Sequence, residues 1–468
     1  MTALSVHPDR LLPADGATRD IARSIYKAVA DAPIVSPHGH VPAHWLSENR
    51  PFSDPASLLV TPDHYVTRIL HGAGVALDRL GVGTPDADPR EIWRLFCSNW
   101  HLYLGTPVRY WFENELAGVF GITEHPSAAN ADDLYDTIAE HLAGPDFTPR
   151  ALFERFGIEV LATTDDPADD LAAHRAIADD ARFPGRVLPT MRADVYMTPA
   201  KDTWLPAIER LSDASGIDCG TYAGLLDALR ARRSFFRAHG STAIDCGVDD
   251  AWATPLDDVD AERIHRDGMK GTVSELDSIA YRRNMLYRFA AMSSEDGLVM
   301  QLHAGVVRNH HAPTFHRFGP DSGHDLPAHA SFVLPLQRLL HDFGTHPRFR
   351  LVLFTVDETA FSREIAPLAG FYPSVFIGAP WWFLDAPAAI ARFRAATTET
   401  AGFYKGSGFI DDTRAFCSIP ARHDMSRRLD AGYLAGLVAS HQLSEDDAHT
   451  IARDLVSSIP RNAFRLDD

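Results

Sequence analysis

The sequence has little lysine, little cysteine and no long apolar run. Its 468 residues include 44 basic ones, yet only Lys27, Lys201, Lys270 and Lys405 are lysines. Because 63 residues are acidic, the formal net charge is −19, which argues against binding to nucleic acid or to an anionic membrane surface. An anionic small molecule would need a local cluster of arginines, whose planar guanidinium group suits a carboxylate.

The four cysteines, Cys97, Cys219, Cys246 and Cys417, are widely separated and lack the CxxC spacing of a zinc site or a redox pair. Reduced thiols in a cytoplasmic protein are the simplest explanation. Residues 1–20 lack the apolar run that forms the centre of a leader peptide, and no apolar stretch is long enough to span a bilayer. We therefore expect a cytoplasmic protein without a membrane partner, and the sequence leaves open whether it forms a homo-oligomer.

What is present is a repeated structural pattern: an apolar run rich in β-branched residues, then polar residues, then a helical stretch. Eight such runs occur, at 34–41, 157–167, 186–194, 241–250, 297–309, 349–359, 374–383 and 406–416. Strands that alternate with helices pair in parallel through right-handed crossovers, and eight such units close a barrel. The sequence therefore predicts an α/β fold of the (β/α)8 TIM type, with an open doubly wound sheet as the alternative.

The chain divides unevenly around this pattern. We expect a helix at 18–31 and the first barrel strand within residues 1–40. Residues 41–155 carry helical signals such as "DPREIWRLFCSNWHLYL" and few strand-like runs, which predicts a large helical insertion over the barrel mouth. Residues 156–468 hold the remainder of the barrel and the C-terminal helices.

Barrels of this type carry their chemistry at the C-terminal ends of the strands, and candidate metal ligands fall there. His38 and His40 follow the first run one residue apart, so on a strand they share a face and suit one metal ion, although an isolated HxH more often begins a loop. Asp412 ends the eighth run, which neighbours the first in a closed barrel. Two imidazoles and a carboxylate suit a catalytic Zn²⁺. His303, in the fifth run, is a candidate further ligand or hydrogen-bond partner of a ligand.

Other strand-end residues suit an anionic sugar. Arg192, Arg308 and Arg414 are candidates for binding a carboxylate, and each has a structural alternative as half of an ion pair. Trp381 ends the seventh run and offers an apolar platform for a sugar ring, although tryptophans more often pack in cores. Asp245 ends the fourth run, where an aspartate often only caps a helix.

His64 and Tyr65 stand side by side within the helical insertion, directly after Asp63, which is a candidate N-cap. If the insertion covers the barrel mouth, both side chains could reach the substrate. They would then be candidates for hydrogen bonding and proton transfer, because both residue types serve as acids and bases.

Seven blocks follow one another along nearly the whole chain: "SPHGH", "TPDHYVTRILHGAGV", "LATTDDPADDLAAH", "QLHAGVVRNH", "GPDSGHDLP", "GAPWWF" and "GFIDDTRAFCSIPARHD". In this order they resemble the uronate isomerase (glucuronate isomerase) family of the amidohydrolase superfamily. The resemblance implies a metal-associated barrel that interconverts D-glucuronate with D-fructuronate, and D-galacturonate with D-tagaturonate. It also implies a metal site, usually zinc, at His38, His40 and Asp412. The active-site residues that it implies are His64, Tyr65, His303, Arg192 and Arg414.

Aldose–ketose isomerisation moves a proton from C2 to C1 through a cis-enediol, and therefore needs a base at C2 and positive charge near the reacting oxygens. We expect Asp412, or a water polarised by the metal, to be that base. Tyr65 and His64 would move the hydroxyl protons. The sequence departs from the family in one place: relatives carry "SDHG" at the fourth strand end, and this chain carries "IDCG", which keeps Asp245 but replaces the histidine by Cys246.

Two other functions compete with the isomerase. A metal-dependent hydrolase or deaminase can use the same scaffold, since fold does not dictate function. A dinuclear hydrolase, however, usually needs a lysine at the fourth strand end and a histidine at the sixth, where this chain has Asp245 and "FTVDET". A non-catalytic binding protein for sugar acids could use the arginines and tryptophans without turning its ligand over.

Overall fold

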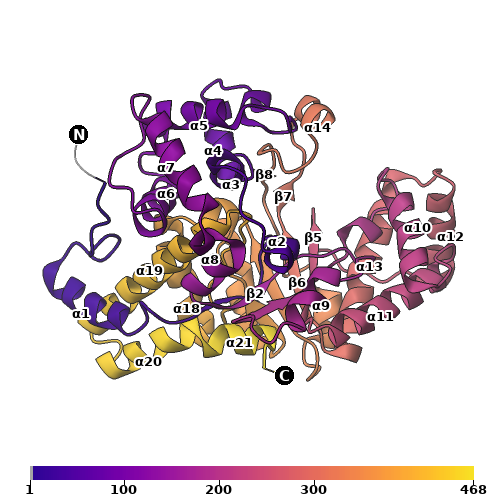
Figure 1. Cartoon of the computed structure of the whole chain (residues 1–468). Coiled ribbons are helices and arrows are strands. Elements are labelled where there is room, and N and C mark those ends of the chain that lie inside the picture. The colour runs from indigo at the N-terminus through magenta and orange to yellow at the C-terminus, as the bar shows by residue number, and fades with distance from the viewer. Residues whose placement is uncertain (1–3, 468) are drawn as a thin grey trace.

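The computed structural model describes residues 4–467, and in it parallel sheets are surrounded by helices (Figure 1). The parallel strands are β1 (Ile34–Ser36), β2 (Ile158–Ala162), β3 (Arg186–Leu188), β4 (Met191–Arg192), β5 (Ala243–Val248), β6 (Val299–Ala304), β9 (Leu351–Thr355) and β10 (Val375–Ile377). They form one sheet in the order β1-β2-β3 and another in the order β10-β9-β6-β5-β4. A separate antiparallel pair is made by β7 (Val306–Val307) and β8 (Leu326–Pro327).

The third expected run joins the two sheets, because it is divided into β3 and β4. The first half pairs with β2 and the second half with β5. Pro189 stands at the division, and a proline has no N–H with which to continue a ladder. A bridge between Asp165 and Met191, with a 2.8 Å hydrogen bond from Arg192 N to Asp165 O, connects the sheets at this point.

The eighth expected run, 406–416, is not a regular strand. Gly408 has φ +72° and Asp412 has φ +44°, both in the left-handed region, so the backbone cannot stay extended. The segment still lies at the eighth position of the ring. Ser407 N donates to Ile377 O of β10 over 2.8 Å, and His40 N donates to Thr413 O over 3.1 Å. The expectation of a regular eighth strand was wrong, while the strand order is that of the expected TIM-type barrel.

The first helix, α1, is Gly16–Lys27 rather than 18–31, because the Asp15 carboxylate caps it by accepting from Thr18 N. The helices within 41–155 are α2 (Ala43–Glu48), α3 (Pro55–Leu59), α4 (His64–Gly72), α5 (Pro89–Ser98), α6 (Pro107–Asn114), α7 (Ala131–Ala143) and α8 (Pro149–Arg155). Figure 1 shows α3 to α7 gathered in purple beyond one end of the strands.

The later helices follow the strands around the barrel. They are α9 (Ala172–Ala178), α10 (Trp204–Ser215), α11 (Tyr222–Ala238), α12 (Asp258–Met269), α13 (Glu275–Asp296), α14 (Ala312–Phe318), α15 (Gln337–Phe343), α16 (Glu358–Ala360), α17 (Ala366–Phe371), α18 (Pro387–Ala401), α19 (Ile419–Ala439), α20 (Glu445–Val456) and α21 (Ser458–Phe464). Within residues 4–467, no helix combines the length and apolar character needed to cross a membrane.

Alternate residues of the strands enter different cores, as the two-residue period requires. On β6 and β9, Met300, Leu302 and Leu353 belong to the apolar cluster that includes α10, α11 and α13. Val352 and Phe354 belong instead to a second apolar cluster, which includes buried residues of the helices within 41–155. His303 stacks on Phe354 at 4.2 Å between ring centroids, so it shares the side of the sheet opposite to Leu302.

Glu115 is a buried acid in the helical segment, at the start of a π-helical turn, Glu115–Val119. Its side chain is only 2% exposed, and it lines a cavity with Cys417 and Ala421 near the start of α19. Burial, with a smaller contribution from the charge of Asp63, raises the pKa of Glu115 to about 8.

Glu115→Gln is expected to remove the loss of folding stability that the buried Glu115 carboxyl causes as the pH rises. The same carboxyl has a pKa of 4.5 in an unfolded chain, so between pH 4.5 and 8 the folded protein holds a proton that the unfolded chain has lost. Stability from this group therefore falls as the pH rises through that window. We expect the Tm of the variant to match that of the wild type near pH 5 and to exceed it by about 2–4 °C at pH 8. The exposed Glu140→Gln is the control, and a Tm difference that does not change with pH would contradict the assignment.

Candidate active site

A cavity of about 550 Å³, counting the part open to solvent, lies at the C-terminal ends of the parallel strands. Its walls include many of the residues expected from sequence, namely His40, His64, Tyr65, Arg192, Arg308, Trp381, Asp412 and Arg414. His38, Asp245 and His303 are buried beside it, and the ring centroids of His38 and His303 are 4.8 Å apart. The structure therefore brings every expected site residue to one end of the barrel.

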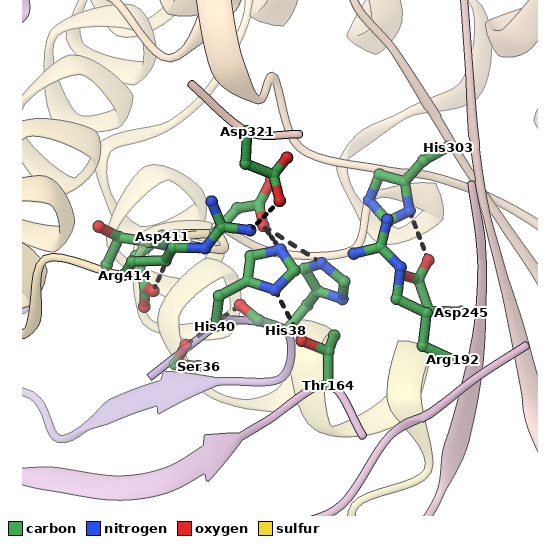
Figure 2. Close-up of polar contacts among 12 residues, drawn as sticks. Ser36, His38, His40, Thr164, Arg192, Asp245, His303, Asp321, Asp411 and Arg414 are labelled. Atoms are coloured by element: carbon green, nitrogen blue, oxygen red, sulfur yellow. Dashed lines mark hydrogen bonds and ion pairs between the residues drawn. The ribbon is translucent and has the colours of Figure 1, made fainter. Parts of the chain in front are cut away.

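His38 and His40 direct the same ring atom toward one carboxylate oxygen. Nε2 of His38 lies 3.2 Å from Oδ1 of Asp412, and Nε2 of His40 lies 2.9 Å from it. The two imidazole rings and their dashed contacts are visible at the centre of Figure 2. Because candidate ligand atoms of all three residues lie within 4.8 Å of one another, one cation can reach all of them.

The donor set fits a divalent cation. Nδ1 of His40 lies 2.6 Å from Thr164 Oγ1, and this hydrogen bond fixes the orientation of the ring. Histidines that bind metal through one ring nitrogen usually make such a hydrogen bond with the other. Burial lowers the pKa of His40, which favours the neutral imidazole. Burial raises the pKa of Asp412, but the contacts to His38 and His40 lower it more, to well below its usual range. A neutral imidazole and an ionised carboxylate are the forms that bind metal.

A second group, His38, Asp245 and His303, also has ligand atoms within 4.8 Å of one another. Here Nδ1 of His303 lies 2.7 Å from Oδ1 of Asp245, and Nε of Arg192 lies 3.7 Å from Oδ2 of the same carboxylate. Figure 2 shows the guanidinium of Arg192 beside Asp245 and His303. Burial raises the pKa of Asp245, but His303 and Arg192 lower it more. A guanidinium at this carboxylate disfavours a second cation there. Asp245 is therefore better suited to hold His303 in place than to bind a metal.

Cys246 replaces the histidine of the family pattern but faces away from the cavity. It lies between Asp245 and Gly247 on β5, so its side chain points to the other face of the sheet. There it is fully buried in the apolar cluster with Ile244 and Leu302. The substitution therefore removes no group from the cavity wall.

The remaining arginines of the cavity are each held in an ion pair. Nη1 of Arg308 lies 2.8 Å from Oδ2 of Asp325, and Nη2 of Arg414 lies 2.8 Å from Oδ2 of Asp321 (Figure 2). Arg414 is two residues after Asp412, a spacing that would place both side chains on one face of a regular strand. The segment is not a strand, but both residues line the cavity.

His64 and Tyr65 begin α4, and the Asp63 carboxylate caps this helix by accepting from Tyr65 N. The two rings stack at 5.1 Å between centroids, and His64 also meets Trp382 edge-on at 5.3 Å. Burial, followed by the positive charge of Arg414, lowers the pKa of His64 to about 3. His64 is therefore a neutral imidazole in the cavity at physiological pH.

A buried hydrogen-bond network holds the hydroxyl of Tyr65 in place. Oδ2 of Asp385 accepts from the Tyr65 hydroxyl and from Nη1 of Arg422, each over 2.8 Å. The guanidinium of Arg422 also lies over the ring of Trp111, 3.5 Å from its centroid. Asp385, Arg422 and the cavity residue Asp321 were not expected from the sequence, because they lie just after a 3₁₀ turn, in a helix and in a loop rather than at strand ends. The blocks "ARHD" and "GPDSGHD" were the available signals for Arg422 and Asp321.

The fold and the site together define a class, an α/β-barrel enzyme with a candidate metal centre and an arginine-rich cavity at its C-terminal rim. The sequence model of glucuronate isomerase matches residues 16–464. A uronate isomerase from Corynebacterium efficiens is 53% identical over 99% of this chain and 100% of its own length. The chain belongs to the glucuronate isomerase family, which confirms the resemblance found in the sequence.

Solved structures agree with this assignment and with the TIM-type fold. The crystal structure of glucuronate isomerase from Caulobacter crescentus has a TM-score of 0.97 and 44% identity, covering 100% of this chain and 98% of that one. The uronate isomerase structure from Thermotoga maritima has a TM-score of 0.92 and 27% identity, covering 98% of this chain and 99% of that one.

Removing one member of the buried pair between Asp385 and Arg422 is expected to destabilise the fold strongly. Asp385→Asn or Arg422→Met should each lower the free energy of unfolding by about 3 kcal/mol or more, because one charge stays buried without its partner. Their side chains are only 5% and 1% exposed. The double variant should cost less than the sum of the two, measured by urea denaturation.

The matched control is the surface pair of Arg392 and Glu358, with side chains 60% and 34% exposed. Glu358→Gln should cost no more than about 1 kcal/mol. Strictly additive costs for Asp385→Asn and Arg422→Met would show that the two buried charges are not coupled.

Proposed function

We propose that this protein interconverts D-glucuronate with D-fructuronate, and D-galacturonate with D-tagaturonate, by moving a proton from C2 to C1 through a cis-enediol. The observation that carries the proposal is a single cavity in which an imidazole–carboxylate cluster faces three arginines. A uronate has both groups that such a cavity recognises, a carboxylate for the arginines and vicinal oxygens for a cation. Membership of the glucuronate isomerase family supports the same reaction.

The metal that best suits His38, His40 and Asp412 is Zn²⁺. Two imidazole nitrogens and one carboxylate leave room for substrate or water, the arrangement typical of catalytic zinc. A bound divalent cation supplies positive charge beside the substrate oxygens on which negative charge develops.

Asp412 is the proposed base at C2. Both histidine contacts use its Oδ1, so Oδ2 is the oxygen available to the substrate, and the low pKa keeps the carboxylate ionised. The Tyr65 hydroxyl, held by Asp385, and the neutral imidazole of His64 would move protons between the hydroxyl oxygens. His303, held by Asp245 through Nδ1, keeps Nε2 free to bind a substrate oxygen.

Substrate binding is assigned to the remaining wall of the cavity. Arg414, Arg192 and Arg308 would hold the carboxylate and neighbouring oxygens, and Trp381, which meets His303 edge-on at 4.8 Å, would supply apolar surface. The helical segment 41–155 would act as a cap, since its residues 62–65 form part of the wall. Four free, buried thiols support a cytoplasmic setting.

The alternative, a metal-dependent hydrolase or deaminase, has less support. A dinuclear hydrolase needs a second cation near the fourth and fifth strands. The guanidinium of Arg192, 3.7 Å from Asp245, places a positive charge at that position instead.

Incubation with D-glucuronate in D₂O is expected to yield D-fructuronate, with deuterium entering C1 of the product and C2 of the recovered substrate. NMR follows both products, and D-galacturonate is tested in parallel. Binding of the uronate without product and without exchange would favour a binding protein over an isomerase.

Within that assay, Asp412→Asn should lower kcat about 100-fold or more, because the amide cannot accept the C2 proton. The control is Asp357→Asn, which changes a strand-end aspartate that caps α16 outside the cavity. Since asparagine caps helices as well as aspartate does, the control should keep its activity. Near-normal turnover by Asp412→Asn would remove the assignment of the base.

The purified protein is expected to contain about one divalent ion per chain by elemental analysis. His40→Asn should lose this ion, because it removes a ligand that belongs only to the group with Asp412. Asp245→Asn should keep it, because Asp245 belongs to the other group. Retention by His40→Asn with loss by Asp245→Asn would move the metal to His303. Assays of both uronates before and after chelation then show whether turnover requires the ion.

A further inference from the structure

The arginines of the cavity differ in how firmly their charges are balanced. Arg192 has two carboxylates, Asp194 at 2.8 Å and Asp245 at 3.7 Å. Arg422 has the buried carboxylate of Asp385. A guanidinium held in this way can still donate a hydrogen bond to a substrate oxygen, but a ligand carboxylate does not readily displace the buried partner that balances its charge.

Arg308 and Arg414 share a third acid, but unequally. Arg308 has its own buried partner, Asp325, which is 3% exposed and also accepts from Asn309 N. Nη1 of Arg308 also lies 3.8 Å from Oδ1 of Asp321. Arg414 contacts Asp321 at 2.8 Å, and the Asp321 side chain is 43% exposed. Of these guanidinium groups, that of Arg414 is balanced by the most exposed acid.

Asp321 comes from the loop between α14 and β8, outside the strand and helix units of the barrel. The residue has φ +58°, and the flanking Gly319 and Gly323 have φ +78° and +88°. Figure 2 shows its carboxylate reaching down to the guanidinium of Arg414 from the side opposite the strands. Burial raises the pKa of Asp321, but Arg414 and Arg308 lower it more, so the group is a carboxylate.

We propose that Asp321 is an internal stand-in for the substrate carboxylate: it neutralises Arg414 in the free protein and is displaced when a sugar acid enters, so that it sets the affinity of the cavity for carboxylates. This inference rests on the proposed function for the identity of the sugar acid. It assigns Asp321 a positioning role and no part in proton transfer.

The exchange requires little net change in the electrostatic free energy of Arg414. One carboxylate replaces another at Arg414, so the guanidinium is balanced before and after binding, and affinity depends on the difference between two similar ion pairs. Because Asp321 is exposed, its carboxylate is readily rehydrated after it leaves. The competing explanation is that Asp321 merely orients Arg414 for the substrate. The two explanations predict opposite effects on affinity when the charge is removed.

The test is Asp321→Asn, which keeps the shape of the side chain and tolerates positive φ. Calorimetry at low ionic strength measures the Kd of D-glucuronate and of D-gluconate, a sugar acid that lacks the aldehyde and cannot be isomerised. Loss of the competing carboxylate should tighten both anions about three- to fivefold, the range expected for a partly exposed ion pair. Weak binding of neutral D-glucose should not change, and in turnover KM should fall while kcat does not rise.

The matched control is Asp78→Asn, which removes the same charge from a 2.6 Å ion pair with Arg317 of α14, outside the cavity. It should leave both affinities unchanged. Weaker or equal anion binding by Asp321→Asn, a gain shared by D-glucose or by the control, or no anion binding to any of the proteins would overturn the proposal. Tighter binding by Asp321→Asn in a protein that shows no isomerisation would sustain the role of Asp321 and refute only the proposed reaction.

Discussion

One carboxylate oxygen, Oδ1 of Asp412, determines the geometry of the site, because two imidazole nitrogens converge on it. The histidines follow the first strand and the aspartate lies near the C-terminal helices, so these contacts join segments that are far apart in the sequence. The two segments meet through irregular backbone, where His40 N donates a hydrogen bond to Thr413 O beside the site. The candidate metal site and the contact between the first and last segments of the barrel therefore depend on the same few residues, and a bound cation would stabilise both.

The sequence was sufficient to predict the barrel, the order of its strands and the residues that gather at its rim. The strands are short and apolar and alternate with helices, and that pattern survives errors of a few residues at each boundary. His38, His40 and Asp412 could be grouped because first and eighth positions are neighbours in any closed barrel. That inference does not need the eighth segment to be a strand, and its left-handed residues Gly408 and Asp412 show that it is not.

The acids that hold the site residues could not be predicted in the same way. Asp385 follows a 3₁₀ turn and Asp321 lies in a loop, where no periodicity links a residue to a direction in space. Their roles follow from which guanidinium each one meets, and this depends on the packing of α19 and of the loop after α14. The same limit applies to Cys246: its neighbour Asp245 enters the site, and only the register of β5 shows that the cysteine does not.

The position of Arg192 suits a reaction other than hydrolysis at a dinuclear metal centre. Hydrolysis at a dinuclear centre needs a second cation to activate water beside the first. Here the carboxylate that could hold that cation, Asp245, is engaged by His303 and lies 3.7 Å from a guanidinium. A fixed organic cation stabilises negative charge on an oxygen but does not generate hydroxide. The charge arrangement therefore suits an enediol-like intermediate, whose oxygens need positive charge but no added water.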